Sequence, residues 1–174
     1  MVDESLKTYI ETKRLILRNW QLNDAEALFK YASDGRVSEL ALWPRHESVE
    51  MSRWVIEEFF LPNLWNFAVV LKDSDEAIGC IGLVPSGDEH FKTADGDREV
   101  GYWIGYPYWN QGLTTEALES FICYCRDCLG LKSLLLTTDS RNFASQRVAE
   151  KCRFQFIADY EYEGMKGNAY RLEL

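Results

Sequence analysis

The sequence predicts an α/β protein: a mixed, mostly antiparallel sheet with helices on both faces. The main observation is a strand–helix–strand unit over residues 98–138. "REVGYWI" (98–104) is typical of a strand, a helical pattern follows at 114–129, and "SLLLTT" (133–138) is a continuous apolar run. Such a run indicates a strand buried on both faces, and a unit of this kind forms a right-handed parallel crossover.

Shorter patterns on either side of the crossover predict the other elements. Asn23 is expected to cap the first helix, and "MKGN" (165–168) is expected to form the last turn. These elements are a strand at 14–20, helices at 24–33 and 48–61, strands at 67–71 and 77–84, a helix at 144–152, and a hairpin of 154–163 and 169–174. Residues 1–174 then form one domain with about seven strands and about four helices.

Composition and charge exclude several classes of protein. With 47% hydrophobic and 14% aromatic residues, the chain can form a packed core. Charges interrupt every apolar stretch before the ~18 residues of a membrane span, and the charged start "MVDESLKTYIETKR" lacks an apolar export signal, so we expect a cytoplasmic protein. The net charge is −9 and no basic patch is visible, so nucleic acid is not an expected partner. A cationic amine or basic peptide suits this charge better.

The cysteine pattern does not predict a metal site. On the helix expected at 114–129, Cys123 lies about 200° around the axis from Cys125, at roughly 100° per residue, while Cys125 and Cys128 share a face. These thiolates cannot all reach one tetrahedral zinc ion, and no histidine lies nearby in the sequence. The cysteines are expected to be small apolar residues of a reduced core.

The loop inside "GYWIGYPYWNQGLTTEAL" (101–118) joins the strand to the helix of the crossover. The first amides of a helix lack internal partners and carry the positive end of its dipole, so a phosphate binds there without a lysine. Gly112 leaves room for close approach, and Thr114 and Thr115 add hydroxyl donors. The loop is therefore a candidate phosphate site, although one glycine also fits an ordinary tight turn.

This stretch and "NFASQRVAEKCRF" (142–154) resemble the two signature segments of the GNAT N-acetyltransferases. Together with the start "ETKRLILRNWQLNDAEALF" (11–29), they resemble the Rim-type branch, whose members acetylate ribosomal-protein N-termini and other amines. The resemblance covers nearly the whole chain except about 40–66 and 85–97, and it implies a GNAT-like fold. The resemblance also implies that acetyl-CoA is the co-substrate, that no metal takes part and that the acceptor carries an amine. It is compatible with a homodimer.

The resemblance also implies where the cofactor binds. The backbone amides of 110–115 would hold the CoA diphosphate, Asn142 would face the pantetheine arm, and an N–H near Ile104 would polarise the thioester carbonyl. The strands ending near Ile104 and Thr138 would splay apart around that arm. The family's loop pattern, Gln/Arg-x-x-Gly-x-Gly/Ala, falls on Trp109, Asn110, Gln111, Gly112, Leu113 and Thr114, with Thr115 next to it.

The catalytic candidates also rest on the resemblance. Ala149 stands where many members carry an acidic tyrosine, and the Rim-type serine is Ser145. For the base, the branch offers a glutamate before a hairpin glycine, which is Glu163, with Glu161 or Glu99 as alternatives. Asn142 and Ser145 also fit a helix cap and its first turn, and each glutamate also fits a solvated strand residue.

Several residues carry weaker expectations. His46 and His90 lie in loops and are expected on the surface, and tryptophans 43, 54 and 65 either line an acceptor pocket or pack. Arg153 occupies a helix C-terminal position usually held by glycine, so a left-handed backbone is expected there.

The leading function is an acetyl-CoA-dependent N-acetyltransferase that attacks the thioester directly with a primary amine. The acceptor is a protein N-terminus, a polyamine, an amino sugar or a drug. The alternatives are a non-catalytic acyl-CoA-binding or sensing domain and, third, a structural module that binds nucleotide phosphates.

Overall fold

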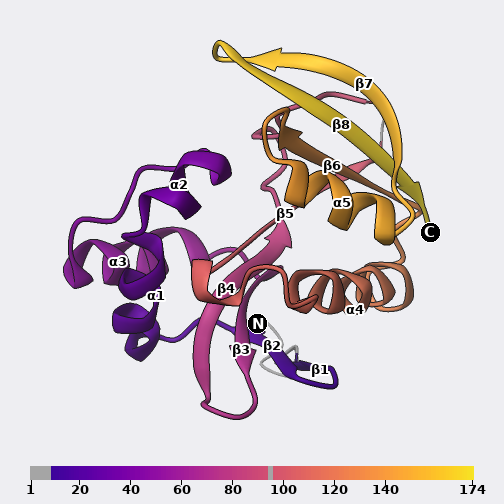
Figure 1. Ribbon diagram of the computed structural model, residues 1–174. Helices are drawn as coiled ribbons and strands as arrows, with labels where there is room; N and C mark the ends of the chain where they lie inside the picture. Colours follow the sequence, from indigo (N-terminus) through magenta and orange to yellow (C-terminus); the bar gives the residue numbers. More distant parts are fainter. Residues whose placement is uncertain (1–8, 94–95) are drawn as a thin grey trace.

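The computed structural model describes residues 9–93 and 96–174 and contains one eight-stranded sheet (Figure 1). The strand order is β1-β2-β3-β4-β5-β6-β8-β7. The strands are β1 (Tyr9–Glu11), β2 (Leu15–Asn19), β3 (Asn66–Leu71), β4 (Glu76–Leu83), β5 (Arg98–Ile104), β6 (Ser133–Asp139), β7 (Gln155–Tyr162) and β8 (Met165–Glu173). The α-helices are α1 (Ala25–Ala32), α2 (Gly35–Ala41), α3 (Val49–Val55), α4 (Leu113–Asp127) and α5 (Phe143–Lys151). A π-helical turn at Ile56–Phe60 continues α3, and 3₁₀ turns lie at Leu22–Asp24 and Tyr106–Tyr108.

The predicted crossover is confirmed. β5 and β6 are parallel and pair from Arg98 opposite Leu134 to Val100 opposite Leu136, with α4 as the connection. The other strand pairs are antiparallel. Short β1 and α2 are additions to the predicted elements, because neither shows a clear hydrophobic period over its few residues.

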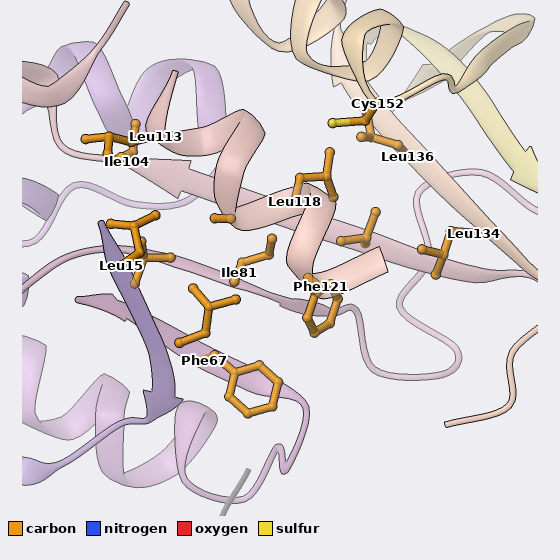
Figure 2. Close-up of a cluster of buried hydrophobic side chains, with 14 of the residues drawn as sticks. Leu15, Phe67, Ile81, Ile104, Leu113, Leu118, Phe121, Leu134, Leu136 and Cys152 are labelled. Carbon is orange, nitrogen blue, oxygen red and sulfur yellow. The ribbon is translucent and has the colours of Figure 1, made fainter. Parts of the chain in front are cut away.

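Two apolar clusters lie on opposite faces of the sheet, as the alternation of side chains along its strands requires. Phe67 and Val69 of β3 belong to the cluster under α4 and α5, whereas Ala68 and Val70 belong to the cluster under α1 and α3. Figure 2 shows the first cluster, in which Phe121 and Leu118 of α4 pack towards β-strand residues such as Phe67 and Ile81. Each such side chain stabilises the fold by roughly 1.5–3 kcal/mol.

The first helix does not begin as predicted. Asn23 is not its cap; the chain first makes a 3₁₀ turn, and Asp24 is buried there. The Asp24 carboxylate accepts two hydrogen bonds from Arg18, each 2.8 Å, and one from the Gln21 amide at 2.9 Å. A tertiary ion pair therefore overrides the local capping preference of Asn23.

The terminal hairpin turns earlier than predicted. Glu163 and Gly164 both have positive φ, 49° and 81°, and Tyr162 pairs with Met165, which is a two-residue hairpin turn. "MKGN" is thus part of β8. Glu163, expected on the penultimate strand, lies at the exposed tip.

Other local expectations have mixed outcomes. Arg153 has φ 68°, so the left-handed helix end is confirmed. Cys125 is buried, but Cys123 and Cys128 are exposed, so the prediction that all the cysteines lie in the core is wrong for these two. Cys123 lies between the buried positions Phe121 and Cys125 of α4, and Cys128 lies beyond the helix as its C-cap. Within the described ranges, no helix has the length and apolar character needed to span a membrane.

Candidate functional site

A large cavity opens where β5 and β6 stop pairing. Beyond Val100 and Leu136 the two strands separate, and β5 continues against β4 while β6 continues against β8. The cavity has a volume of about 1320 Å³ and runs from the start of α4 past α5 to the loops around α2 and α3. The expected splay between these strands is therefore present, at the carboxyl end of the parallel pair, where α/β sheets bind ligands.

The loop before α4 enters the helix through two residues with positive φ. Gly112 caps the helix with φ 75° and no side-chain capping bond, and Asn110 has φ 60°. The first amide bonded inside the helix is that of Glu116, which donates to the Gly112 carbonyl at 3.0 Å. The amides of 113–115 precede it and carry the positive end of the dipole. Asn110, Gly112, Leu113, Thr114 and Thr115 all line the cavity.

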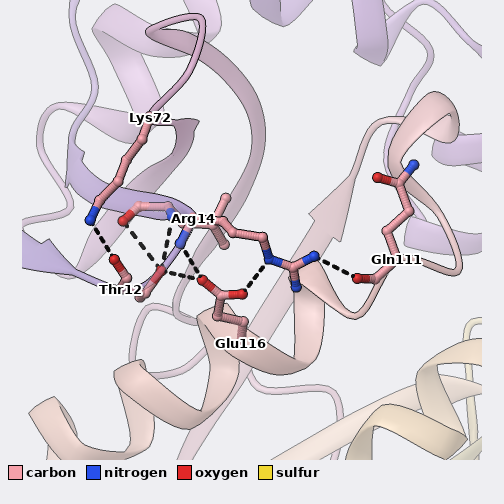
Figure 3. A network of polar contacts seen from close by, with 6 residues as sticks. Thr12, Arg14, Lys72, Gln111 and Glu116 are labelled. Carbon is pink, nitrogen blue, oxygen red and sulfur yellow. Dashed lines mark hydrogen bonds and ion pairs between the residues drawn. The ribbon is translucent and has the colours of Figure 1, made fainter.

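An arginine that the sequence analysis missed supports this loop (Figure 3). Arg14 on the turn before β2 donates to the Gln111 carbonyl at 3.0 Å and to Glu116 at 2.7 Å. Thr12 donates to the other Glu116 oxygen at 2.6 Å. Burial alone would raise the pKa of Glu116, but the hydrogen bonds from Thr12 and Arg14 lower it. The network fixes the loop to the N-terminal segment and places a guanidinium 3.6 Å from where a Cβ on Gly112 would lie.

The amide of Ile104 faces the splay. Gly105 donates to the Ile78 carbonyl at 2.8 Å and Val84 donates to the Glu99 carbonyl at 2.8 Å. In an antiparallel ladder only alternate residues bond to the same neighbour, so Glu99, Trp103 and Gly105 bond to β4. The N–H of Ile104 consequently points to the β6 side, and the Ile104 carbonyl accepts from the Trp109 indole at 2.9 Å.

Ser145 and Asn142 lie together on α5 at the cavity wall. Asn142 caps α5, and its side chain accepts from the Ser145 amide at 3.1 Å. The Ser145 hydroxyl lies 3.0 Å from the hydroxyl of Tyr102, a β5 residue that the sequence analysis did not single out. Burial raises the pKa of Tyr102, so its hydroxyl stays protonated at neutral pH. The alternation of β5, which turns Tyr102 towards α5, was the available signal for this contact.

Glu99 is buried inside the cavity and is held by three donors. His90 donates from its amide and lies with its Nδ1 2.8 Å from the other carboxylate oxygen, and Thr137 donates at 2.5 Å. The expectation that His90 is a plain surface residue is therefore wrong. The hydrogen bond that His90 donates to Glu99 raises the pKa of His90 against the effect of partial burial, and the charges of Glu163 and Asp88 add to the rise.

The other glutamates lie farther from the cavity. Glu163 at the hairpin tip and Glu161 on β7 are exposed, and neither is among the described residues that line the cavity. His46 is also not on the surface: it is buried, and its Nδ1 lies 2.7 Å from the Ser52 hydroxyl. Its loop packs under α1, where the His46 amide donates to the Ala32 carbonyl.

Aromatic side chains form the far wall. Trp43 packs edge-on against Trp103, with ring centroids 5.5 Å apart, and lines the cavity. Trp54 also lines it and remains half exposed. Trp65 does not line the cavity; Arg98 lies over its ring. Among the described residues no group of three or more His, Cys, Asp or Glu side chains is arranged to hold a metal ion.

Comparison with known proteins agrees with this geometry. The model of the acetyltransferase (GNAT) domain matches residues 14–155. A Bacillus licheniformis protein named as the uncharacterized N-acetyltransferase p20 is 29% identical over 157 residues, which cover 86% of this chain and 85% of that protein. A GNAT-family acetyltransferase from Bacillus anthracis superposes with a TM-score of 0.81 at 22% identity, over 95% of this chain and 98% of that one. RimL, the ribosomal L7/L12 α-N-protein acetyltransferase solved with coenzyme A, superposes with a TM-score of 0.78 at 16% identity, over 96% and 98% of the two chains. At these identities the two structures show the shared fold.

Proposed function

Because the chain belongs to the GNAT acetyltransferase family, we propose that it transfers the acetyl group of acetyl-CoA to a primary amine by direct attack on the thioester. The single observation that carries the proposal is the splay of β5 and β6, which leads to the start of α4, where the cap Gly112 supplies no side-chain hydrogen bond. A pantetheine arm fits between the strands, and a diphosphate fits the helix start.

The backbone amides of the loop would hold the diphosphate. Asn110 and Gly112 have positive φ, as residues of anion-binding backbone nests do. The loop and the first residues of α4 consist of Trp109, Asn110, Gln111, Gly112, Leu113, Thr114 and Thr115. Arg14 holds this loop through its hydrogen bond to the Gln111 carbonyl, and Glu116 balances the Arg14 charge. Asn142 lines the same cavity next to the gap and would meet the pantetheine arm.

The reaction needs a neutral amine, a polarised carbonyl and a leaving thiolate. The Ile104 amide, which faces the gap, would stabilise the negative charge that develops on the thioester oxygen. Ser145, paired with the Tyr102 hydroxyl, would donate a proton to the departing sulfur. A carboxylate would assist removal of the amine proton, with Glu163 and Glu99 as the candidates. Glu99 is the better placed of the two because it lines the cavity.

The acceptor is a protein N-terminus or a small amine of the kind that the Rim-type branch modifies. The support is the opening segment 11–29, which resembles that branch, and the structural likeness to RimL, which is named for its action on L7/L12. An α-amine, with a pKa of ~7.7, is partly neutral at physiological pH and needs less help than a lysine amine at ~10.4.

A panel assay tests the proposal. The unmodified protein is incubated with acetyl-CoA and, in turn, a peptide with a free N-terminus, spermidine and glucosamine, and the release of thiol is followed. We expect amine-dependent release. Binding of acetyl-CoA without release with any amine would favour the alternative, a non-catalytic acyl-CoA-binding domain, which Ala149 in place of the family's tyrosine keeps open.

A further inference from the structure

Gly101 of β5 has no side chain, so a recess lies over this position on the face of the sheet that α1 and α3 cover. Side chains of Glu99 and Trp103 point to this face, and the residue between them is Gly101. Gly101 is exposed and lines the cavity, and a Cβ placed on it would have Val84 Cγ2, 3.8 Å away, as its nearest neighbour. Residues rise roughly 3.3 Å along a strand, so Glu99 and Trp103 lie roughly 13 Å apart and leave room over Gly101 for one small group between their side chains.

Its two ends differ in chemistry. At one end Glu99 is buried and held by Thr137 and His90. At the other end Trp103 packs against Trp43. An aromatic face opposite a carboxylate is an environment that attracts a primary ammonium group.

His90 completes the recess with a basic nitrogen. Its Nδ1 lies 2.8 Å from Glu99 Oε1, and a carboxylate only accepts hydrogen bonds, so Nδ1 carries the proton and Nε2 keeps a lone pair. No described residue hydrogen-bonds Nε2, and His90 lines the cavity. The Tyr162 ring, with its centroid 5.0 Å from that of His90, fixes the imidazole from the side of the terminal hairpin.

We propose that the recess over Gly101 seats the acceptor amine and that His90, held by Glu99, takes the proton from that amine. The inference rests on the proposed acetyl transfer and deepens it, because it names the amine's seat and makes Glu99 a positioning residue instead of the base. The recess admits a primary amine that enters in its cationic form and whose first carbon bears no bulky substituent.

The step balances without a further reactant. The ammonium first gives one proton to His90 Nε2, and the neutral nitrogen then forms a bond to the thioester carbon. The C–S bond breaks and its electron pair leaves with the sulfur, which takes a proton from Ser145. The nitrogen releases its second proton to solvent, and Ser145 regains one from solvent. Glu99 remains a carboxylate throughout, and the imidazolium returns its proton to solvent before the next turnover.

The pH dependence follows from the charges around His90. Glu99 on β5, Asp88 on the preceding loop and Glu163 on the terminal hairpin all favour its protonated form. Since only neutral His90 accepts a proton, kcat rises with pH through the raised pKa of His90. That midpoint lies above the ~6.5 of an ordinary histidine. Removal of the Glu99 charge shifts it to lower pH.

The decisive experiment measures kcat against pH for the unmodified protein, His90→Gln, Glu99→Gln and Glu163→Gln, with a serine-initiated peptide, spermidine and glucosamine as separate acceptor probes. His90→Gln is expected to lose the rising limb and to lower kcat by about 10²-fold or more. Glu99→Gln should keep the limb with its midpoint at lower pH, and Glu163→Gln should keep it nearly in place. Acetyl-CoA affinity by calorimetry should stay within a factor of about two in all variants.

Gly101→Ala tests the seat independently. The added methyl meets no described atom closer than 3.8 Å, so the fold should be kept, whereas the KM for the amine should rise by roughly tenfold or more. Gly35→Ala is the matched control: its Cβ also has open space and it does not line the cavity, so its KM should be unchanged.

Two outcomes overturn the inference while leaving acetyl transfer intact. The first is a pH limb that survives in His90→Gln, or disappears in Glu163→Gln alone. The second is an unchanged KM in a folded Gly101→Ala. Absence of any amine acetylation by the unmodified protein overturns the proposed function and this inference with it.

Discussion

Charge placed at the cap of α4 should weaken CoA binding strongly. Gly112 has φ 75°, a conformation that both aspartate and asparagine tolerate better than most residues, so Gly112→Asp and Gly112→Asn share the same backbone cost. The two variants differ by a single negative charge. The difference in CoA affinity between them therefore isolates electrostatics at the proposed diphosphate site.

The size of the effect follows from Coulomb's law. At an effective dielectric constant of ~20 and a separation of about 6 Å, two unit charges repel by about 2.8 kcal/mol. The Arg14 guanidinium, 3.6 Å from the Cβ position, offsets part of this repulsion by pairing with the new carboxylate. A net loss of about 2 kcal/mol remains, so Gly112→Asp should bind CoA roughly 30-fold more weakly than Gly112→Asn.

Isothermal titration calorimetry with CoA at low salt measures the difference, and thermal unfolding checks that both variants are folded. The gap between them should narrow at high salt because the charges are partly exposed. Equal affinity of the two folded variants would refute the placement of the diphosphate at the start of α4.

Three further outcomes are expected. Ser145→Ala should lower kcat by about 10²-fold or more and leave the affinity for acetyl-CoA unchanged, because the serine hydroxyl acts in the transition state. An unchanged kcat in steady-state assays would show that Ser145 has no part in catalysis. Arg153→Gly should stabilise the protein by about 0.5–1 kcal/mol in urea unfolding, because φ 68° strains any residue with a Cβ; a loss of stability would contradict this reasoning. Glu116→Gln should make Tm fall less steeply as the pH is lowered. The lowered pKa of Glu116 contributes stability that is present above its unfolded-state pKa of ~4.3 and is lost as the pH falls through its folded-state pKa. Identical profiles of Tm against pH for the two proteins would count against the network.

The sequence allowed prediction where the signal is local. The crossover and the glycine before α4 could be predicted because a strand pattern, a glycine and a helix pattern follow each other directly. The left-handed backbone at Arg153 could be predicted for the same reason. The start of α2 shows the limit of local signals. Asp34 caps this helix by accepting from the Arg36 amide at 3.0 Å, but the seven residues of the helix show no clear hydrophobic period.

The missed parts of the site depend on contacts between distant segments. Arg14 and Glu116 are far apart in the chain, and nothing near either residue predicts their ion pair. The Tyr102–Ser145 contact joins β5 to α5 in the same way. His90 lies in a loop without hydrophobic periodicity, so its role becomes visible only when β5 brings Glu99 beneath it.

A crystal structure of the complex with CoA tests the central claim most directly. We expect diphosphate oxygens within hydrogen-bonding distance of the amides between Gly112 and Thr115, and the pantetheine arm between β5 and β6 beyond Val100 and Leu136. The thiol end should then lie next to the Ile104 amide. CoA bound outside this gap, or a diphosphate away from the start of α4, would contradict the account.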